Sequence, residues 1–285
     1  MGSHYLPQQY LRGFEVPSDP GTIWVYDKKL SRFKHLPIKV VAQEPGFYDP
    51  STEKALSENI EGPANTVLAA LRKEKSLDRN HRLKLALYIS AMIMRVPRRR
   101  RKAREMVPSA IQSTVDRTRN AVESLARRKG TDRLQVQRML NEIERVRKMF
   151  QLEPPPNLVH QIRSPWPSEK MVRTVYDMVW RIVRAPANAQ FLTGDNPAFF
   201  FEGFGLGTPR AELTFPIASD LALFGCWQGH KADLIHIQAR PVLVRELNRR
   251  VASGSERFVF FHSEQAWVAT VADKQDPHLS EIRWQ

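Results

Sequence analysis

The sequence predicts an α+β fold in which a central helical block lies between short strands contributed by both ends of the chain. Apolar residues recur at helical spacings through the middle of the chain, as they do on one face of a helix. Short runs rich in β-branched and aromatic residues occur toward both ends, and these are typical of strands. The 285 residues, 42% of them hydrophobic, can bury an adequate core, so we expect one α+β domain over residues 1–285.

The N-terminal third is predicted to hold a β-hairpin followed by two helices. Two β-rich runs, residues 22–26 and 33–41, flank a polar turn and should pair with each other. Ser51 or Thr52 is expected to cap one long helix, and Asp78 is expected to cap a second. The second helix is apolar on nearly every side, so it belongs in the core.

Residues 98–151 are predicted to form a basic antiparallel helical hairpin that protrudes from the domain. Each of its two helices carries one narrow apolar stripe on an otherwise basic cylinder, and Gly130 separates the two helices. The stripe residues are Val107, Ile111, Val115, Thr118, Val122 and Leu125 in the first helix, and Val136, Met139, Ile143, Val146 and Phe150 in the second.

The C-terminal part is predicted to alternate between helices and short strands. Ser168 is expected to cap a helix that extends to about residue 184, and a further helix is expected over residues 242–251. Strands are expected at residues 190–193, 198–201, 212–216, 222–227, 257–261 and 266–271.

The positive charge of the chain is concentrated in one quarter of it. Residues 79–150 contain twenty Lys and Arg against six Asp and Glu, which accounts for the entire net charge of +14. Such a field attracts polyanions, so we expect DNA or RNA as a partner through residues 79–150. The alternative is a solvated helix whose charge serves solubility. Aromatic residues are scarce over residues 98–149, which argues against stacking on single-stranded bases.

Cysteine content and hydropathy give two further expectations. Cys226 is the only cysteine, so an internal disulfide is excluded and a reducing, cytoplasmic location is expected. It lies in an apolar run, which predicts a buried and inert thiol. The longest apolar stretch, residues 83–94, is shorter than the roughly 20 residues that span a bilayer, so we expect no membrane partner.

Several short motifs occur in order along the chain. In their order and spacing they resemble the bacterial family named domain of unknown function 4238, from residue 4 to about residue 262. The chain departs from the family at Gly194, where Ser is more usual, and in the length and basicity of residues 98–150. The resemblance implies one integrated domain and carries no established chemistry. The motifs are His4-Tyr5-Leu6-Pro7, Tyr10-Leu11-Arg12-Gly13-Phe14, Val25-Tyr26-Asp27-Lys28, Phe47-Tyr48, Ile60-Glu61, Arg95-Val96-Pro97, Phe191-Leu192-Thr193-Gly194-Asp195-Asn196-Pro197, Phe215-Pro216-Ile217-Ala218, Glu246-Leu247-Asn248 and Arg257-Phe258-Val259.

Three polar residues that are far apart in the sequence are candidate catalytic residues: His4, Glu61 and Asp195. Glu61 and Asp195 are also candidate ligands of a divalent cofactor such as Mg²⁺ or Mn²⁺, because carboxylate oxygens bind these ions. His4 could act as a general base, since a histidine titrates near neutral pH. Each residue also has a structural interpretation. His4 could pin the N-terminal loop, Glu61 could be an exposed helix acid, and Asp195-Asn196-Pro197 could form a turn.

Seven residues are candidate substrate-binding residues: Arg12, Arg95, Arg98, Arg99, Arg101, Lys102 and Asn196. The cations would contact phosphate groups, and such binding would weaken strongly with salt. Arg95 ends a core helix and must pair or reach solvent, so it could instead clamp Glu61 or Asp195.

Two functions follow from these residues. The first is a metal-dependent nuclease, in which the hairpin grips phosphates while His4, Glu61 and Asp195 surround the ion. The second is a non-enzymatic nucleic-acid-binding or assembly module whose polar motifs are structural. We favour the nuclease, because a polar motif near each end of the fold needs an explanation. The hairpin could also pair with a second copy to form a homodimer, against the repulsion of its charges.

Overall fold

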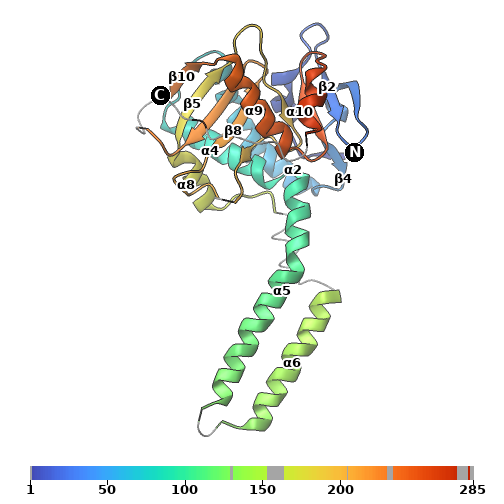
Figure 1. The fold of residues 1–285 in the computed structure, drawn as a ribbon, viewed down its shortest axis with the longest axis vertical. Coiled ribbons are helices and arrows are strands. Elements are labelled where there is room, and N and C mark those ends of the chain that lie inside the picture. The colour runs from blue at the N-terminus through green and yellow to red at the C-terminus, as the bar shows by residue number, and fades with distance from the viewer. Residues whose placement is uncertain are drawn as a thin grey trace. The chain divides into compact units, whose positions relative to one another are not determined.

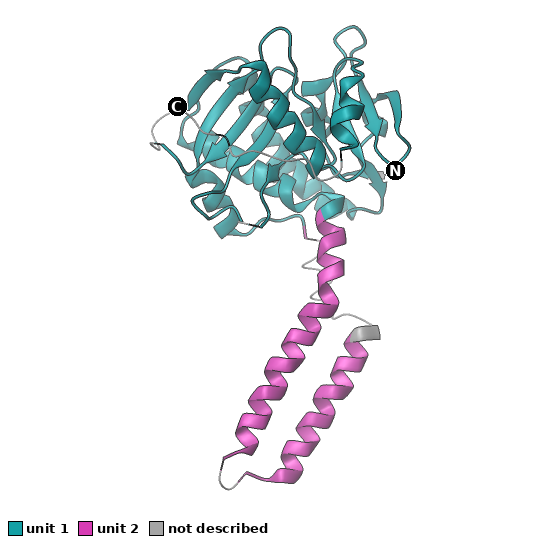
Figure 2. Cartoon of the chain, viewed as in Figure 1, with its two compact units in different colours: residues 1–98, 165–285 teal, residues 99–164 magenta. Residues whose placement is uncertain are grey.

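The computed structural model describes residues 2–128, 131–152, 164–203, 205–229, 234–274 and residue 282. The protein has an α+β fold, as the sequence predicts, with helices and several separate sheets. The chain divides into two compact units (Figure 2). Unit 1 contains residues 1–98 and 165–285, and unit 2 contains residues 99–164.

The N-terminal elements of unit 1 include a small sheet and a hairpin (Figure 1). β1 (Gly2–His4) pairs antiparallel with β4 (Gln43–Pro45). The predicted hairpin is confirmed, because β2 (Thr22–Asp27) pairs antiparallel with β3 (Arg32–Pro37). The connections contain the short helix α1 (Gln8–Leu11) and two 3₁₀ turns, Arg12–Phe14 and Ile38–Val40.

Two larger sheets complete the β part of unit 1. The five-stranded sheet has the order β10-β5-β9-β8-β7, in which only the β10-β5 pair is parallel. The four-stranded sheet has the order β3-β2-β11-β6, so strands from both ends of the chain pair in it. The remaining strands are β5 (Val179–Arg184), β6 (Thr193–Gly194), β7 (Phe199–Phe200), β8 (Leu213–Ala218), β9 (Leu221–Cys226), β10 (Ile235–Gln238) and β11 (Phe258–Phe261).

Two predicted elements of the C-terminal part are wrong. Residues 179–184, expected to end a helix, form β5, and the helix α8 (Glu169–Asp177) stops before them. β5 lies between β9 and β10 and is buried on both faces almost throughout, so its apolar residues, interrupted by Arg181, do not alternate in a way that separates a strand from a helix. Residues 266–271, expected as a strand, lie mostly in α10 (Trp267–Ala272). α10 packs on the confirmed helix α9 (Pro241–Gly254).

The first predicted helix is three consecutive helical segments. α2 (Pro50–Leu56) is followed by a π-helical turn, Ser57–Glu61, and then by α3 (Gly62–Arg72). Pro63 near the start of α3 lacks the N–H that an uninterrupted α-helix would use, and proline is a recognised cause of such breaks. Glu61 is the last residue of this turn, and its carboxylate contacts Arg95.

The helix caps show which sequence signals are reliable. Asp78 caps α4 (Arg79–Met94) as predicted, because its carboxylate accepts the N–H of His81 at 2.7 Å. α2 is capped by Asp49, which accepts the N–H of Thr52 at 2.9 Å, so neither Ser51 nor Thr52 is the cap. A carboxylate followed by proline at the first helical position is the stronger start signal.

The core of unit 1 is built around α4, as its apolar sequence predicts. α4 packs against α3 and α8. Its middle and C-terminal turns are buried on all sides, which explains why few polar residues occur there. The buried residues of α4 are Leu85, Ala86, Tyr88, Ile89, Ser90, Ala91, Met92 and Ile93.

Unit 2 contains most of α5 (Pro97–Ala126) and all of α6 (Arg133–Leu152), which run side by side in opposite directions (Figure 1). Three members of the first predicted stripe are buried, namely Val107, Ile111 and Val122. The stripes are narrower than predicted. Thr118 is exposed, Leu125 and Met139 are each 42% exposed, and Leu140 is half-buried in place of Met139.

The expectations from hydropathy and cysteine content can be compared with the structure. Among the described residues, no helix combines the length and the apolar character needed to cross a membrane. Cys226 is buried at the end of β9, as predicted, and the Nη1 of Arg181 donates to its sulfur at 2.7 Å.

Candidate functional site

Asp195 is a buried carboxylate that organises the backbone at the start of β11. It follows β6 and is only 3% exposed. Its Oδ1 accepts the N–H of Glu256 at 2.7 Å, and its Oδ2 accepts the N–H groups of Arg257 at 2.7 Å and Phe258 at 2.8 Å. Burial raises the pKa of Asp195 to about 6, against the opposing effect of these N–H donors. The carboxylate therefore satisfies three backbone donors.

The same region neutralises the C-terminal end of α9. The carbonyl oxygen of Gly254 accepts from Arg98 Nη1 at 2.7 Å and from Asn196 Nδ2 at 3.1 Å. Lys28 Nζ donates to the carbonyl oxygens of Ala252 at 3.0 Å and Ser255 at 2.9 Å. The last carbonyls of a helix lack partners within the helix and carry partial negative charge, so cations are favourable there. We call the set Lys28, Arg98, Asp195 and Asn196 the polar junction.

Gly194 fits the polar junction because a side chain would not. A Cβ at Gly194 would lie 1.8 Å from Ser255 Oγ and 3.1 Å from the carbonyl oxygen of Phe258. Ser255 in turn is buried and donates to the carbonyl oxygen of Val251 at 2.8 Å. Gly194, where the family more usually has Ser, is thus matched by Ser255, which fills the adjacent space.

Arg95 contacts two of the predicted catalytic residues, Glu61 and His4, and these contacts hold the fold together. Arg95 is 2% exposed, and its Nη1 donates to Glu61 Oε1 at 2.5 Å. Its Nη2 donates to the backbone carbonyl oxygen of His4 at 2.8 Å. Tyr48 donates its hydroxyl to the Arg95 carbonyl oxygen at 3.5 Å. The clamp on Glu61, one of the alternatives from the sequence, is what the contacts show.

The contacts do not gather the three predicted catalytic residues around one point. The ring of His4 lies 3.2 Å from the carbonyl oxygen of Lys39, which fits its role in pinning the loop. Glu61 is held by Arg95, and Asp195 by backbone N–H groups. Among the described residues, no group of three or more His, Cys, Asp or Glu is arranged to hold a metal ion. The metal site of Glu61 and Asp195 stays a prediction that these contacts do not support.

The predicted substrate-binding cations divide between the two units. In unit 1, Arg12 is exposed and lies 3.7 Å from Glu15, while Arg98 contacts Gly254 and lies 3.5 Å from Glu202. Arg98 therefore has a structural partner, as do Arg95 and Asn196. Arg99, Arg101 and Lys102 lie in the first turns of α5 that belong to unit 2, and Arg101 is 3.6 Å from Glu105 on the same helix.

The helices of unit 2 keep a surplus of exposed positive charge. Four of its acids pair with arginines of the same helix three or four residues away, at 2.5 to 3.7 Å: Glu105, Glu123, Glu142 and Glu144. Such pairs neutralise one arginine each. Five further arginines are exposed and form no ion pair within the described parts of the chain: Arg104, Arg127, Arg128, Arg133 and Arg138.

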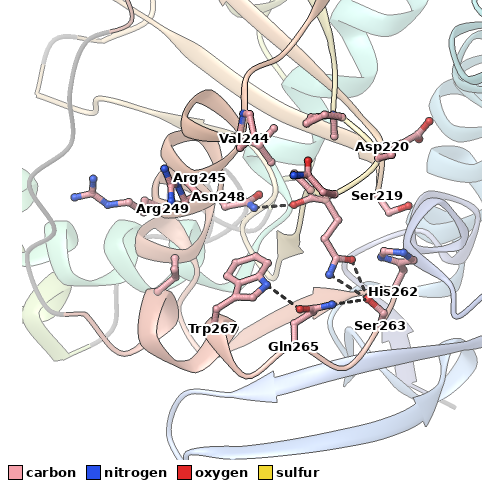
Figure 3. A pocket seen from close by; sticks show the side chains of 18 of the residues that line it. Ser219, Asp220, Val244, Arg245, Asn248, Arg249, His262, Ser263, Gln265 and Trp267 are labelled. Carbon is pink, nitrogen blue, oxygen red and sulfur yellow. Dashed lines mark hydrogen bonds between the residues drawn. The ribbon is translucent and has the colours of Figure 1, made fainter.

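A pocket in unit 1 was not predicted from the sequence. It has a volume of about 890 Å³ and is lined by residues of the loop 185–190, of residues 219–220, of α9 and of the segment 262–271 (Figure 3). These segments are spread over residues 185–271 and carry no known motif, so no spacing in the sequence points to them. Among the lining residues, His262 and the pair Ser219-Asp220 fit no zinc or nucleophile pattern in the sequence.

Hydrogen bonds fix one wall of this pocket (Figure 3). Trp267 Nε1 donates to Gln265 Oε1 at 3.1 Å, and Gln265 Nε2 donates to Ser263 Oγ at 3.4 Å. Ser263 Oγ also bonds the side-chain amide of Gln190, at 3.1 Å to its Nε2. Asn248 donates its Nδ2 to the Gln190 carbonyl oxygen at 2.8 Å. The wall is therefore preformed by side chains that hold one another.

The fold and these sites define an α+β protein with a buried polar junction, an open pocket and a basic helical unit. The model of the family described as protein of unknown function (DUF4238) matches residues 3–265, nearly the whole chain. The chain belongs to this family, which confirms the resemblance seen in its motifs. No curated protein and no solved structure matches the chain.

Proposed function

We propose that this protein binds nucleic acid through unit 2, without a chemical step. The single observation that carries the proposal is the exposed positive surplus of α5 and α6. Residues 99–150 contain fifteen Lys and Arg against six Asp and Glu. A surface of this kind attracts the phosphate backbone and releases counterions on binding.

The pairing within unit 2 supports this proposal. Its acids bond within their own helices, so they leave the arginines near the connection between α5 and α6 without ion pairs in the described residues. Arg127, Arg128 and Arg133 are exposed there within seven residues of sequence. Arg138 lies further along α6, where it is also exposed. Cations clustered in this way suit a run of phosphates better than a single anion.

Composition favours contact with the backbone over contact with bases. Residues 99–149 contain no Phe, Tyr or Trp, so the one aromatic ring of α5 and α6, among the described residues, is that of the half-buried Phe150 near the end of α6, and stacking on bases is not favoured. Contacts to phosphate position a protein but carry no sequence information. We therefore expect binding that is insensitive to sequence and sensitive to salt.

The test is a binding titration with a charge-matched control. Fluorescence anisotropy of a labelled duplex of about 30 base pairs would be measured from about 50 to 300 mM salt. Replacing Arg127, Arg128 and Arg133 together by Ala should weaken binding about tenfold or more and reduce the salt slope by about 2 to 3. The control replaces Lys29, Arg32 and Lys34, three exposed cations of the unit 1 hairpin, and should change affinity less than about twofold.

Two results would overturn the proposal. The first is an affinity that does not change with salt. The second is an equal loss of affinity in the control and in the unit 2 variant.

Parallel titrations with single-stranded DNA, duplex DNA and RNA of the same length decide which polyanion is preferred. Size-exclusion chromatography with and without duplex tests the predicted homodimer in the same samples.

The metal-dependent nuclease stays a separate prediction. Incubating the same duplex with the protein and Mg²⁺ or Mn²⁺ should leave it intact if unit 2 only binds. Cleavage that disappears in Asp195→Asn, in a variant shown to be folded by its unfolding curve, would replace the binding proposal by the nuclease. Glu61→Gln is the second variant for this test, since it keeps an acceptor for Arg95.

A further inference from the structure

The pocket of unit 1 has the size and composition of a small-molecule site. Its volume of about 890 Å³ lies in the range of ligand pockets, which are usually largely preformed. Its lining combines apolar residues of the loop 185–190 with charged and amide side chains from three other segments. All of them belong to unit 1, so the pocket is independent of unit 2.

One side of the pocket is cationic. Arg245 and Arg249 both line it and lie one turn apart on α9, about 6 Å between their Cβ atoms. Arg249 lies 3.1 Å from Glu246, while Arg245 is exposed and forms no ion pair with a described residue. α9 also begins at this pocket, at Pro241, so its positive dipole end adds to the field. Arginine binds phosphate or carboxylate oxygens in a bidentate manner.

A second side offers an aromatic ring and unused amide hydrogens. The Trp267 indole is fixed by its bond to Gln265 and remains partly exposed. Gln265 uses one amide hydrogen on Ser263, and a primary amide has two to donate. A ring of fixed orientation beside free amide hydrogens suits a flat heteroaromatic group with polar edges.

The side of the pocket away from the arginines carries a histidine with an unused nitrogen. Figure 3 shows His262 beside Ser219, with Asp220 above them. The Nδ1 of His262 is buried and has no hydrogen-bond partner among the described residues. Burial lowers the pKa of His262, against an opposing effect of Asp220, which itself pairs with Arg184 at 2.5 Å. Burial therefore favours the neutral imidazole, which can donate one hydrogen bond and accept another.

We propose that this pocket binds a nucleotide, with its phosphate at Arg245 and Arg249 and its base against Trp267. The polar edge of the base faces Gln265 and His262. The pocket combines two arginines, a fixed aromatic ring and amide groups. An inorganic anion would need no ring and an apolar ligand would need no arginine, so this combination favours a nucleotide over both. The same chemistry is present in a free mononucleotide and in the phosphorylated end of a strand.

The test is calorimetry on the full-length chain carrying Arg127→Ala, Arg128→Ala and Arg133→Ala, which removes competing phosphate contacts on unit 2. AMP, GMP, CMP and UMP are titrated alongside their nucleosides and inorganic phosphate. At least one monophosphate should bind about tenfold more tightly than its nucleoside and than phosphate alone. A 5′-phosphorylated tetranucleotide in a parallel titration separates the two sources. Tighter binding than the monophosphate assigns the pocket to strand ends, and weaker binding assigns it to free nucleotides.

Three variants connect the binding to the pocket. Arg245→Ala should weaken the monophosphate about tenfold and leave the nucleoside unchanged. Trp267→Ala should weaken both, with Trp267→Phe as the substitute if the alanine variant unfolds. Arg173→Ala on α8, an arginine whose side chain is 81% exposed and lies outside the pocket, is the matched control and should change neither.

The inference fails if no nucleotide binds at about 1 mM, or if Arg245→Ala and Arg173→Ala have equal effects. A second readout is the His262 resonance, which a bound monophosphate should shift and free phosphate at the same concentration should not. The inference does not depend on unit 2, so loss of duplex binding with retained nucleotide binding, or the reverse, identifies which of the two proposals is wrong.

Discussion

Two ion pairs of nearly equal length show how differently the two units use charge. Arg95 and Glu61 in unit 1 are 2.5 Å apart, with side chains 3% and 19% exposed. Arg145 and Glu142 in unit 2 are 2.6 Å apart, with side chains 79% and 56% exposed. Water screens the second pair and leaves the first almost unscreened. The same geometry therefore holds a fold together in one unit and leaves a surface open to an outside partner in the other.

The difference extends to the residues around each pair. In unit 1 the charged side chains of the polar junction and of Arg95 form hydrogen bonds with backbone atoms. Removing one of these side chains therefore leaves buried backbone donors or acceptors unsatisfied. In unit 2 the acids bond along the helix surface, where water replaces a lost partner. Stability should thus respond strongly to charge changes in unit 1 and hardly at all to those in unit 2.

The largest effect is expected for Asp195→Ala. The substitution leaves three N–H groups without their acceptor, at about 1 to 3 kcal/mol each, so the free energy of unfolding should fall by about 4 kcal/mol. Urea unfolding followed by tryptophan fluorescence measures this loss. Asp195→Asn keeps one acceptor oxygen and should lose less. A loss below about 1 kcal/mol in both variants would contradict the structural role.

The second effect is a pH dependence carried by Asp195. Its pKa of about 6 in the folded protein lies above the ordinary 3.8, so the folded state binds the proton more tightly. The resulting stability is complete below about pH 4 and is lost as pH rises through 6, by up to about 3 kcal/mol. Unfolding curves at pH 4 and pH 7 should show the wild-type advantage over Asp195→Asn shrinking as pH rises. An advantage that grows would mean that the N–H donors outweigh burial.

Glu61→Ala should come next. It leaves the nearly buried guanidinium of Arg95 without its carboxylate, and the free energy of unfolding should fall by about 2 to 3 kcal/mol. Glu61→Gln keeps a hydrogen-bond acceptor and should recover part of this loss. Chemical denaturation of the three proteins at pH 7 makes the comparison. Equal stability of wild type and Glu61→Ala would show that the buried pair has no structural value.

The smallest effect is expected for Glu142→Ala in unit 2. Both partners of this pair are exposed, and exposed ion pairs contribute little to stability, so the urea midpoint should not move measurably. Affinity for duplex DNA should instead rise slightly, because the variant frees Arg145. A clear loss of stability would mean that unit 2 depends on its surface pairs as unit 1 does on its buried ones.

Local signals in the sequence predicted much of the fold. Asp78 and Ser168 were recognised as helix caps, and the hairpin of β2 and β3 followed from its β-rich runs and polar turn. β5 was missed because a strand buried on both faces has no alternation to distinguish it from a helix. Asp49 was missed as a cap because the choice among neighbouring cap residues depends on which one adopts the extended backbone.

The site residues were found as motifs, but their roles were not. Asp195 and Arg95 stood out in the sequence, yet a carboxylate that binds a metal and one that binds backbone N–H groups look alike until their partners are known. The partners of Asp195 lie about sixty residues further along the chain. The pocket could not be predicted from the sequence for the same reason, because its four segments meet only in the folded protein.

The single cysteine of this chain has a practical consequence. Cys226 is 4% exposed and held against Arg181, so it should react slowly with maleimides in the folded protein. A cysteine placed at an exposed position, such as Lys34 in unit 1 or Arg138 in unit 2, would then be labelled selectively. A donor and an acceptor dye at these two positions would report the distance between them by energy transfer. The natural thiol would not need to be removed.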